Sequence, residues 1–211
     1  MLVMTRTFFI TSACLISASL AHAEDFHRYN IVVGVGPAIP TGYSTNYLST
    51  APLVKAGFGY RFTRLLQADF AFQAAFHAAN NQNAELSNFG QVQGSDHEFM
   101  IPMGGRLIIP APFKRMEFSL GGGAVYLHYS ETVPSGGYYS SSCYTCTSRG
   151  GWGGYGLGNA SYFLDDNHNF RVGATFQYIA AKTNGQAVGN IPALKTTDHC
   201  AVLAIEFGLS F

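Results

Sequence analysis

The chain has 211 residues with 12 basic and 12 acidic side chains, so its formal net charge at pH 7 is zero. This balance provides no basic field for nucleic acid. Only 11% of the residues are charged, while 14% are aromatic and 24 are glycines, and a soluble domain usually has about 25% charged residues. The composition therefore indicates that much of the folded surface faces something other than water.

The first 23 residues have the pattern of a secretory signal peptide. Arg6 precedes an apolar run over 8–20, and Ala21-His22-Ala23 gives the small-x-small pattern that precedes a cleavage site. The apolar run is too short for a membrane helix, which needs about 20 residues. We therefore expect export, a cleaved signal peptide over 1–23 and one domain over 24–211.

The remainder of the chain has no continuous apolar run of about 18 residues, which excludes a membrane-spanning helix. Lipid tolerates no unpaired backbone groups, so an exported, weakly charged chain is left with a closed antiparallel barrel as its membrane structure. Such a barrel needs segments of about 10 residues in which apolar positions alternate with small or polar ones. The sequence has eight, over 28–36, 53–62, 66–77, 98–109, 115–129, 152–164, 170–181 and 201–211.

Two of these segments have the clearest alternation. In 66–77, apolar residues occupy every even position, and Gln67 and Asp69 lie on the opposite face. In 201–211, every odd position is apolar and Glu206 lies on the opposite face. A helix does not produce a period of two, so both segments predict β-strands with one apolar face.

The sixth segment, 152–164, changes phase along its length. Tyr155 and Leu157 occupy odd positions, whereas Tyr162 and Leu164 occupy even ones. A strand keeps all its apolar residues on one face only if an extra residue is inserted between two such groups. We therefore expect a β-bulge in this strand.

The connections between the eight segments alternate in length. Short connections cover 63–65, 110–114 and 165–169, and long ones cover 37–52, 78–97, 130–151 and 182–198. In outer-membrane barrels the short turns face the periplasm and the long loops face outside. The long loops are rich in Asn, Ser, Gly and Tyr, which suits contact with an extracellular ligand.

The chain resembles the small eight-stranded outer-membrane barrels of Gram-negative bacteria, a family that includes the OmpA membrane domain and OmpX. The resemblance rests on the eight segments and on Phe211 with Leu209 and Phe207 at alternate positions before it. The family's fuller pattern has a glycine where this chain has Glu206. The resemblance implies recognition by the barrel-assembly machinery, location in the bacterial outer membrane, and contact with its lipid and lipopolysaccharide. The expected fold is all-β: a closed antiparallel up-and-down eight-stranded transmembrane β-barrel with short periplasmic turns and long extracellular loops.

The inward face of the predicted barrel carries charges of both signs. They are Lys55, Arg61, Asp69, Glu98, Arg106, Arg115, Glu117, Arg171 and Glu206. Eight strands enclose only enough space for side chains, and buried charges are tolerated when they are paired. We expect a lumen filled by ion pairs, in which Glu206 accepts from an inward arginine. The alternative is a narrow passive pore with a charged water path.

Cys143 and Cys146 lie in the third long loop, where an exported protein can keep a disulfide, and we expect them to form a local staple. Cys200 is left over; it competes for either partner or stays a buried thiol. His97 and His199 stand beside acids, but their spacing matches no metal-ligand motif. No metal and no cofactor are expected.

The stretch from His128 to Glu131 contains the one combination that suggests catalysis. His128 and Ser130 share one face of the fifth segment, and a serine beside a histidine is the start of a nucleophile and base pair. The stretch looks like the His-x-Ser sequence of PagL, the outer-membrane lipid A deacylase. That resemblance implies Ser130 as nucleophile and His128 as base, with Glu131 or Glu117 orienting the histidine.

The sequence as a whole favours a function without chemistry. We expect a monomeric, non-enzymatic barrel with a structural or surface-interaction role. A passive pore and a lipid A deacylase are the two alternatives.

Overall fold

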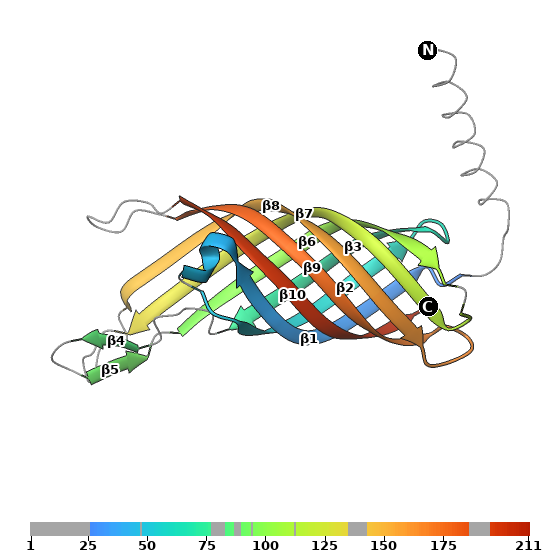
Figure 1. Cartoon of the computed structure of the whole chain (residues 1–211), viewed down its shortest axis with the longest axis horizontal. Coiled ribbons are helices and arrows are strands. Elements are labelled where there is room, and N and C mark those ends of the chain that lie inside the picture. Colours follow the sequence, from blue (N-terminus) through green and yellow to red (C-terminus); the bar gives the residue numbers. More distant parts are fainter. Residues whose placement is uncertain are drawn as a thin grey trace, which may run out of the picture.

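The wall of the molecule consists of eight antiparallel strands that close on themselves (Figure 1). In chain order they are β1 (Tyr29–Thr41), β2 (Ala51–Arg61), β3 (Leu66–Phe76), β6 (Ser95–Pro110), β7 (Met116–Pro134), β8 (Cys143–Phe163), β9 (Phe170–Gly185) and β10 (Lys195–Ser210). Each wall strand pairs with the next one along the chain, and β1 pairs with β10. Closure leaves no strand edge unpaired. The prediction of an all-β, eight-stranded up-and-down barrel is confirmed.

The computed structural model describes residues 26–46, 48–76, 83–86, 90–93, 95–111, 113–134, 143–185 and 195–211. Within these ranges, residues 83–86, 90–93, 95, 110, 131–134 and 143–147 are described by their backbone alone. The predicted signal peptide, 1–23, lies outside the described residues. Within the described part of the chain, no helix is long and apolar enough to cross a membrane.

The two ends of the barrel differ in their connections. The short turns after β2, β6 and β8 lie at the end that also holds the C-terminus, which we call the turn end (Figure 1). The opposite end, the loop end, carries two elements outside the wall: the 3-10 helix η1 (Gly42–Asn46) and the hairpin of β4 (Asn83–Leu86) and β5 (Gly90–Gln93). Short and long connections therefore alternate as the sequence predicts.

The closing segment of the sequence forms most of β10 with the predicted alternation. Its odd-numbered residues from Leu203 to Phe211 are exposed outside the barrel, and its even-numbered residues from Val202 to Ser210 are buried inside. The same alternation runs through β9, and through β1 and β2 over most of their length. The outer face is therefore an apolar belt, which is unfavourable in water and suited to hydrocarbon.

Aromatic side chains border this apolar belt at both ends. Tyr126 and Trp152 lie together near the loop end, with ring centroids 5.3 Å apart. Near the turn end, the ring of Tyr29 lies 5.4 Å from Tyr60 and 5.7 Å from Phe211. Aromatic belts of this kind mark the two membrane–water interfaces of a spanning protein.

The predicted bulge in 152–164 is wrong, because β8 keeps one phase throughout this stretch. Its pairing with β7 and with β9 continues without a shift from residue 152 to Phe163. Tyr155 and Leu157 are buried in the lumen, while Trp152 is exposed outside. The change of phase in the sequence arises because the apolar residues Tyr155 and Leu157 occupy inward positions, so apolar residues occur on both faces of the strand.

Several wall strands extend further toward the loop end than predicted. β1 continues through Pro37, which pairs with Pro52 of β2, although both prolines were expected to lie in a loop. Proline lacks an N–H group but adopts extended backbone angles, so it weakens the ladder without ending the strand. The loop predicted over 130–151 is likewise reduced to 135–142, because β7 and β8 extend into it.

Candidate functional site

The turn-end half of the lumen holds an ion-pair network centred on Glu117 of β7. Arg61 of β2 donates from Nη2 to both carboxylate oxygens of Glu117, at 2.7 Å each. Arg171 of β9 donates from Nη1 to the same carboxylate at 3.3 Å and from Nη2 to Oδ1 of Asn30 at 2.6 Å. Two guanidinium groups thus share one carboxylate, in charge-assisted hydrogen bonds that stabilise a buried acid.

Gln67 of β3 connects this carboxylate to a second ion pair. Arg106 donates from Nε to Asp69 at 2.6 Å, and Nε2 of Gln67 donates to the other oxygen of Asp69 at 2.6 Å. Oε1 of Gln67 accepts from Asn30 at 2.8 Å and from Arg61 at 3.2 Å. The two ion pairs therefore belong to one continuous hydrogen-bonded network.

A third ion pair, between Lys55 and Glu206, lies deeper in the lumen. Nζ of Lys55 and Oε1 of Glu206 are 2.5 Å apart, and each side chain is 6% exposed. The two residues come from β2 and β10, and Gly34 of β1 lies between them as the register partner of both. A Cβ atom at Gly34 would lie 3.0 Å from Cγ of Glu206. The glycine therefore leaves the space in which Lys55, rather than the predicted arginine, reaches the glutamate.

The structure brings seven of the nine predicted inward charges together in these pairs. They are Lys55, Arg61, Asp69, Arg106, Glu117, Arg171 and Glu206. Glu98 lies inside the barrel but at the loop end.

Arg115 lies outside the lumen, contrary to the prediction. It is in the turn before β7, where its guanidinium pairs with Asp166 of the neighbouring turn, and its side chain is 39% exposed. The hydrogen bond to Asp166 raises the pKa of Arg115. The strand starts one residue later than expected, so Arg115 precedes the wall instead of facing inward.

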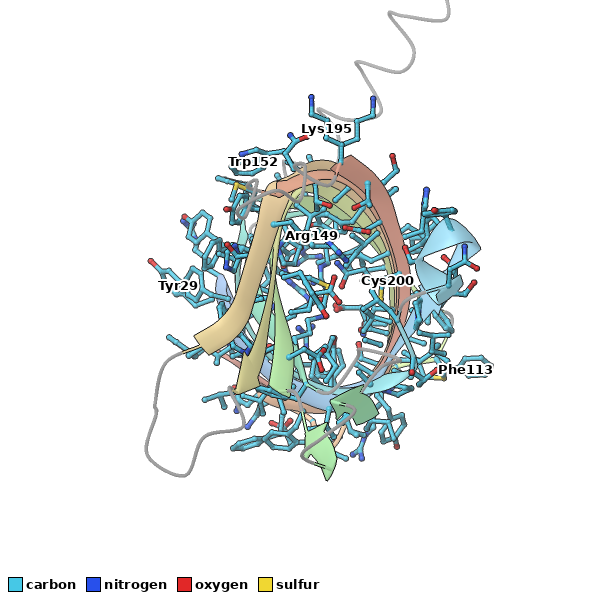
Figure 2. The ribbon with its side chains drawn as sticks, turned by 90° about the vertical axis from the view of Figure 1, so that its left-hand side faces the viewer. Tyr29, Phe113, Arg149, Trp152, Lys195 and Cys200 are labelled. Atoms are coloured by element: carbon cyan, nitrogen blue, oxygen red, sulfur yellow. The ribbon has the colours of Figure 1, made fainter. Side chains whose placement is uncertain are left out.

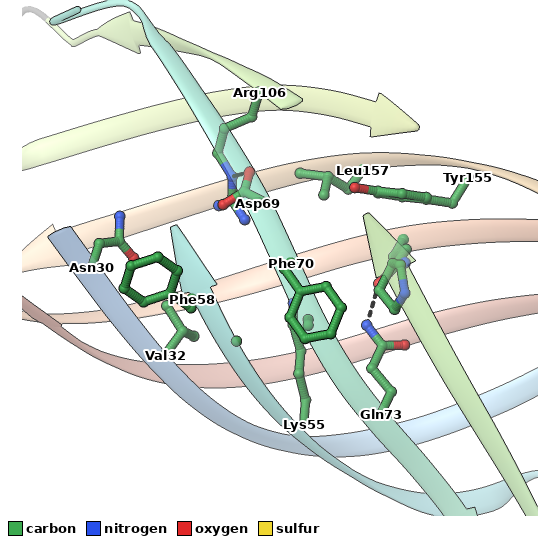
Figure 3. Close-up of a pocket in the computed structure, with 14 residues that line it drawn as sticks. Asn30, Val32, Lys55, Phe58, Asp69, Phe70, Gln73, Arg106, Tyr155 and Leu157 are labelled. Atoms are coloured by element: carbon green, nitrogen blue, oxygen red, sulfur yellow. Dashed lines mark hydrogen bonds and ion pairs between the residues drawn. The ribbon is translucent and has the colours of Figure 1, made fainter. Parts of the chain in front are cut away.

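A layer of uncharged side chains, the neutral layer, lies in the middle of the lumen, on the loop-end side of the ion pairs. Gln73 donates from Nε2 to Oε1 of Gln177 at 2.7 Å across the barrel. Met100, the register partner of Gln73, has no solvent exposure, and the same holds for Val125 and Ile179. The cavity between this layer and the ion pairs has a volume of about 20 Å³ (Figure 3), which is enough for about one water molecule.

The loop-end half of the lumen contains an acidic group that sequence reasoning missed. Asp96, Glu98 and Asp198 are all buried, and the described cation among them is Arg149. Nε of Arg149 is 3.3 Å from Asp198, and its guanidinium lies 4.4 Å from the centre of the Tyr129 ring. Two of these acids fall within the predicted loops, and only the greater length of the strands places them inside the barrel.

Oxygen atoms from neighbouring side chains complete the surroundings of Asp198. Thr183 of β9 donates its hydroxyl to Oδ2 of Asp198 at 2.6 Å, and Thr196 donates to the same oxygen at 3.3 Å. Cys200 is a free, buried thiol on the same strand. Among the described residues, no three His, Cys, Asp or Glu side chains are arranged to hold a metal ion.

The candidate catalytic residues lie on the outer face of β7 near the loop end. His128 and Ser130 share that face, and the register pairs Ser130 with His97 of β6. Glu117, offered as an orienting acid, is instead inside the barrel and bound to Arg61. The backbone of Glu131 pairs with Asp96, but its side chain lies outside the described ones. The structure therefore groups Ser130 and His128 of β7 with His97 of β6. Of the two acids considered, Glu117 lies apart from this group and the side chain of Glu131 is not described.

The side chains of Cys143 and Cys146 also lie outside the described ones, so the disulfide stays a prediction. Their backbone begins β8 rather than forming a loop. His97 and His199, considered together for a metal site, lie on β6 and β10, which are not neighbours in the wall. His199 instead hydrogen-bonds through Nδ1 to the hydroxyl of Tyr178 at 3.1 Å.

No family model matches the chain, and no curated protein is similar to it in sequence. Solved structures are similar in fold. OprG of Pseudomonas aeruginosa superimposes with a TM-score of 0.58 at 12% identity, covering 88% of this chain and 97% of OprG. A major outer membrane protein of Thermus thermophilus gives a TM-score of 0.54 at 10% identity, covering 90% of this chain and all of that protein. The chain has the fold of the small outer-membrane β-barrels.

AlkL, solved in DMPC lipid bilayers, is another outer-membrane barrel with this fold. Its TM-score is 0.53 at 13% identity, covering 90% of this chain and 94% of AlkL. In an outer-membrane barrel the apolar belt contacts lipid. His97, His128 and Ser130 lie on the outer face of the wall, and Tyr126 is two residues before His128 on the same face.

Proposed function

We propose that this chain is a non-enzymatic integral protein of the bacterial outer membrane, closed to ions, which interacts with an extracellular ligand through its loops. The turn end then faces the periplasm and the loop end faces outside. The exposed alternate residues Phe207, Leu209 and Phe211 support recognition by the barrel-assembly machinery during insertion. The likeness to OprG and AlkL supports the fold and the membrane location.

The neutral layer is the observation that supports a lumen closed to ions. Gln73 and Gln177 bond to each other across the lumen, and Met100 and Val125 fill the space beside them without solvent exposure. An ion passing this level would lose its water without gaining charged partners, which costs many kcal/mol. The ion pairs below it occupy the remaining space with paired groups instead of a hydrated path.

Single-channel recording in planar bilayers tests the closed state. We expect wild-type protein, inserted and verified by its heat-dependent gel mobility, to give no stable conductance steps. A matched pair of variants sharpens the test: Met100→Gly with Ile179→Gly removes side chains from the neutral layer, and Leu120→Gly with Leu203→Gly removes lipid-facing ones. Steady unit conductance from the wild type would overturn the closed lumen.

The loop-end hairpin of β4 and β5 offers a direct test of surface interaction. Cells that display the wild type and cells that display a variant with 83–93 replaced by a Gly/Ser linker should differ in binding to immobilised extracellular glycans or host proteins. A variant with the turn after β8 replaced serves as control, because that turn faces the periplasm. Equal binding by all three would contradict an interaction through this hairpin.

A lipid hydrolase is the second candidate, and one feature of the pairing between β6 and β7 favours it. His97 lies directly opposite Ser130 on the lipid-facing side, and His128 lies two residues before it. In such a site the Ser130 hydroxyl would attack an ester carbonyl while a histidine accepts its proton. The ester C–O bond would break, the histidine would return the proton to the departing lipid alcohol, and water would hydrolyse the acyl-serine to release the fatty acid. Incubation of wild type and Ser130→Ala with lipid A, followed by mass spectrometry, decides between the candidates. The absence of fatty acid release from the wild type excludes the hydrolase.

A further inference from the structure

The middle of the lipid-facing side of β8 has almost no side chains. Between Trp152 and Tyr162, its outward positions are Gly154, Gly156, Gly158 and Ala160. Ten residues of a strand span roughly 33 Å, which at a tilt of about 45° corresponds to roughly 23 Å of membrane depth. The bare stretch therefore extends through the hydrocarbon layer from one aromatic belt to the other.

Nothing within the barrel requires these outward glycines. A Cβ atom at Gly154, Gly156 or Gly158 would lie 3.5 to 4.0 Å from its nearest neighbour, which is ordinary contact. The inward Gly153 differs, because a Cβ there would lie 2.0 Å from the carbonyl oxygen of Ala180. Glycine destabilises a strand relative to residues with side chains. The outward glycines therefore keep space open for something outside the wall.

A groove on the outer face of the wall crosses this bare stretch at Gly158 and Ala160, toward the turn end. It has a volume of about 770 Å³, and its floor includes Gly158, Ala160 and Ala174 of β8 and β9. It continues past Leu120 of β7 to Ile109 of β6, and past Phe176 of β9 to Leu203 of β10 and Val35 of β1. The lining is almost entirely apolar, so its chemistry matches a hydrocarbon chain rather than a polar ligand.

Positive charge lies at the loop end of the same side. Lys182 of β9 is exposed and pairs in register with Trp152, and Lys195 of β10 is exposed two positions further out (Figure 2). Asp198, the acid nearest to Lys195 along the chain, is buried inside the lumen. The connecting sequence, 186–194, contains no acidic residue.

The turn end of this side has no such surplus. Lys114 and Arg115 lie there, but Asp165 and Asp166 of the neighbouring turn balance them. An anionic lipid headgroup is therefore favoured at the loop end, where each basic residue near the membrane surface adds attraction. With the orientation proposed above, the loop end lies in the outer leaflet.

We propose that this side of β8 and β9 binds an anionic, phosphate-bearing lipid of the outer leaflet, with its acyl chains along the glycine floor and its phosphate at Lys182 and Lys195. The inference rests on the proposed location of the chain in the outer membrane. It requires no enzymatic activity and no open lumen.

Native mass spectrometry of the folded protein in detergent tests this site, with lipid A as anionic probe and phosphatidylcholine as neutral probe. We expect the wild type to retain lipid A in preference to phosphatidylcholine. Lys182→Gln with Lys195→Gln should weaken lipid A binding by roughly 30-fold, because two positive charges are removed from the headgroup level. Gly156→Leu with Gly158→Leu should weaken it as well, with both lysines intact.

Two matched controls separate the site from general effects. Lys114→Gln removes a cation at the turn end, and Ala68→Leu adds a side chain to the outward face of β3; both should bind lipid A like the wild type. Equal binding by the lysine variant, the glycine variant and the wild type would overturn the site. Heat-dependent gel mobility verifies folding of each variant. Conductance, recorded separately, would overturn the closed lumen without affecting this result.

Discussion

The two halves of the lumen differ in how their buried charges are compensated. In the turn-end half, four cations face three carboxylates, and hydrogen bonds through Gln67 and Asn30 connect two of the ion pairs. In the loop-end half, three carboxylates share one described cation, Arg149, among largely apolar neighbours. Among the described residues inside the lumen, positive charge therefore exceeds negative charge in the turn-end half, and negative charge exceeds positive charge in the loop-end half.

This difference shows where the stability of the barrel is concentrated. A buried pair is weakly stabilising as a unit, but removal of one partner leaves an uncompensated charge. The turn-end network should therefore be sensitive to single substitutions that break a pair. The neutral layer between the halves should respond to a reduction in side-chain volume instead.

Substitution of the shared carboxylate should have the largest effect. Glu117→Leu leaves Arg61 and Arg171 facing each other without their anion. We expect the free energy of unfolding in detergent to fall by roughly 3–5 kcal/mol, measured by urea titration with tryptophan fluorescence. An unchanged midpoint would mean that the network is not a closed unit.

The deeper ion pair should give a smaller, reversible effect. Glu206→Leu leaves Lys55 buried without its partner and should cost about 3 kcal/mol. Addition of Lys55→Met to that variant should restore stability to within about 1 kcal/mol of the wild type. If the double variant is as unstable as the single one, the loss comes from packing rather than from charge.

The stability of the barrel should depend on the volume of the side chains in the neutral layer. Met100 has no solvent exposure, so Met100→Ala should cost about 2–3 kcal/mol through the cavity it creates. Leu120→Ala, on the lipid-facing side, should cost less because lipid can occupy the space. Equal costs for both, by the same titration, would contradict a rigid layer in the lumen.

The turn after β8 should show the smallest effect, and it should depend on pH. The backbone N–H of Phe170 donates to the Asp165 carboxylate at 2.8 Å and lowers the pKa of Asp165. The stabilisation is therefore present above the unfolded pKa of about 3.9 and is lost as the pH falls through the lower, folded value. The protection factor of the Phe170 amide against hydrogen exchange should therefore decrease at low pH in the wild type. Asp165→Asn should remove this pH dependence.

The sequence predicted the strands well where one face is apolar and the other is not. The alternation in 201–211 and 66–77 is strict because one face carries apolar side chains throughout, while the other includes polar ones such as Glu206 and Asp69. The bulge was predicted wrongly because Tyr155 and Leu157 face the lumen although they are apolar. A period of two identifies a face only when the two faces differ in polarity.

The inward charges were predictable as a set, but their partners were not. Lys55 meets Glu206 because both strands pair with Gly34, and this depends on the stagger of the strands around the closed wall. Asp96 and Asp198 were not expected in the lumen because β6 and β10 begin earlier in the chain than their predicted segments. Partners and strand ends are properties of the closed barrel and are not encoded in any single segment.

The pairing of β1 with β10 joins the first wall strand to the last. Until β10 is in place, any partly assembled chain exposes two rows of unsatisfied N–H and C=O groups, which a hydrocarbon environment penalises heavily. In the outer-membrane location proposed above, we expect insertion to be nearly all-or-none. The pairing of β1 with β10 would therefore form only when all the strands of the wall are present.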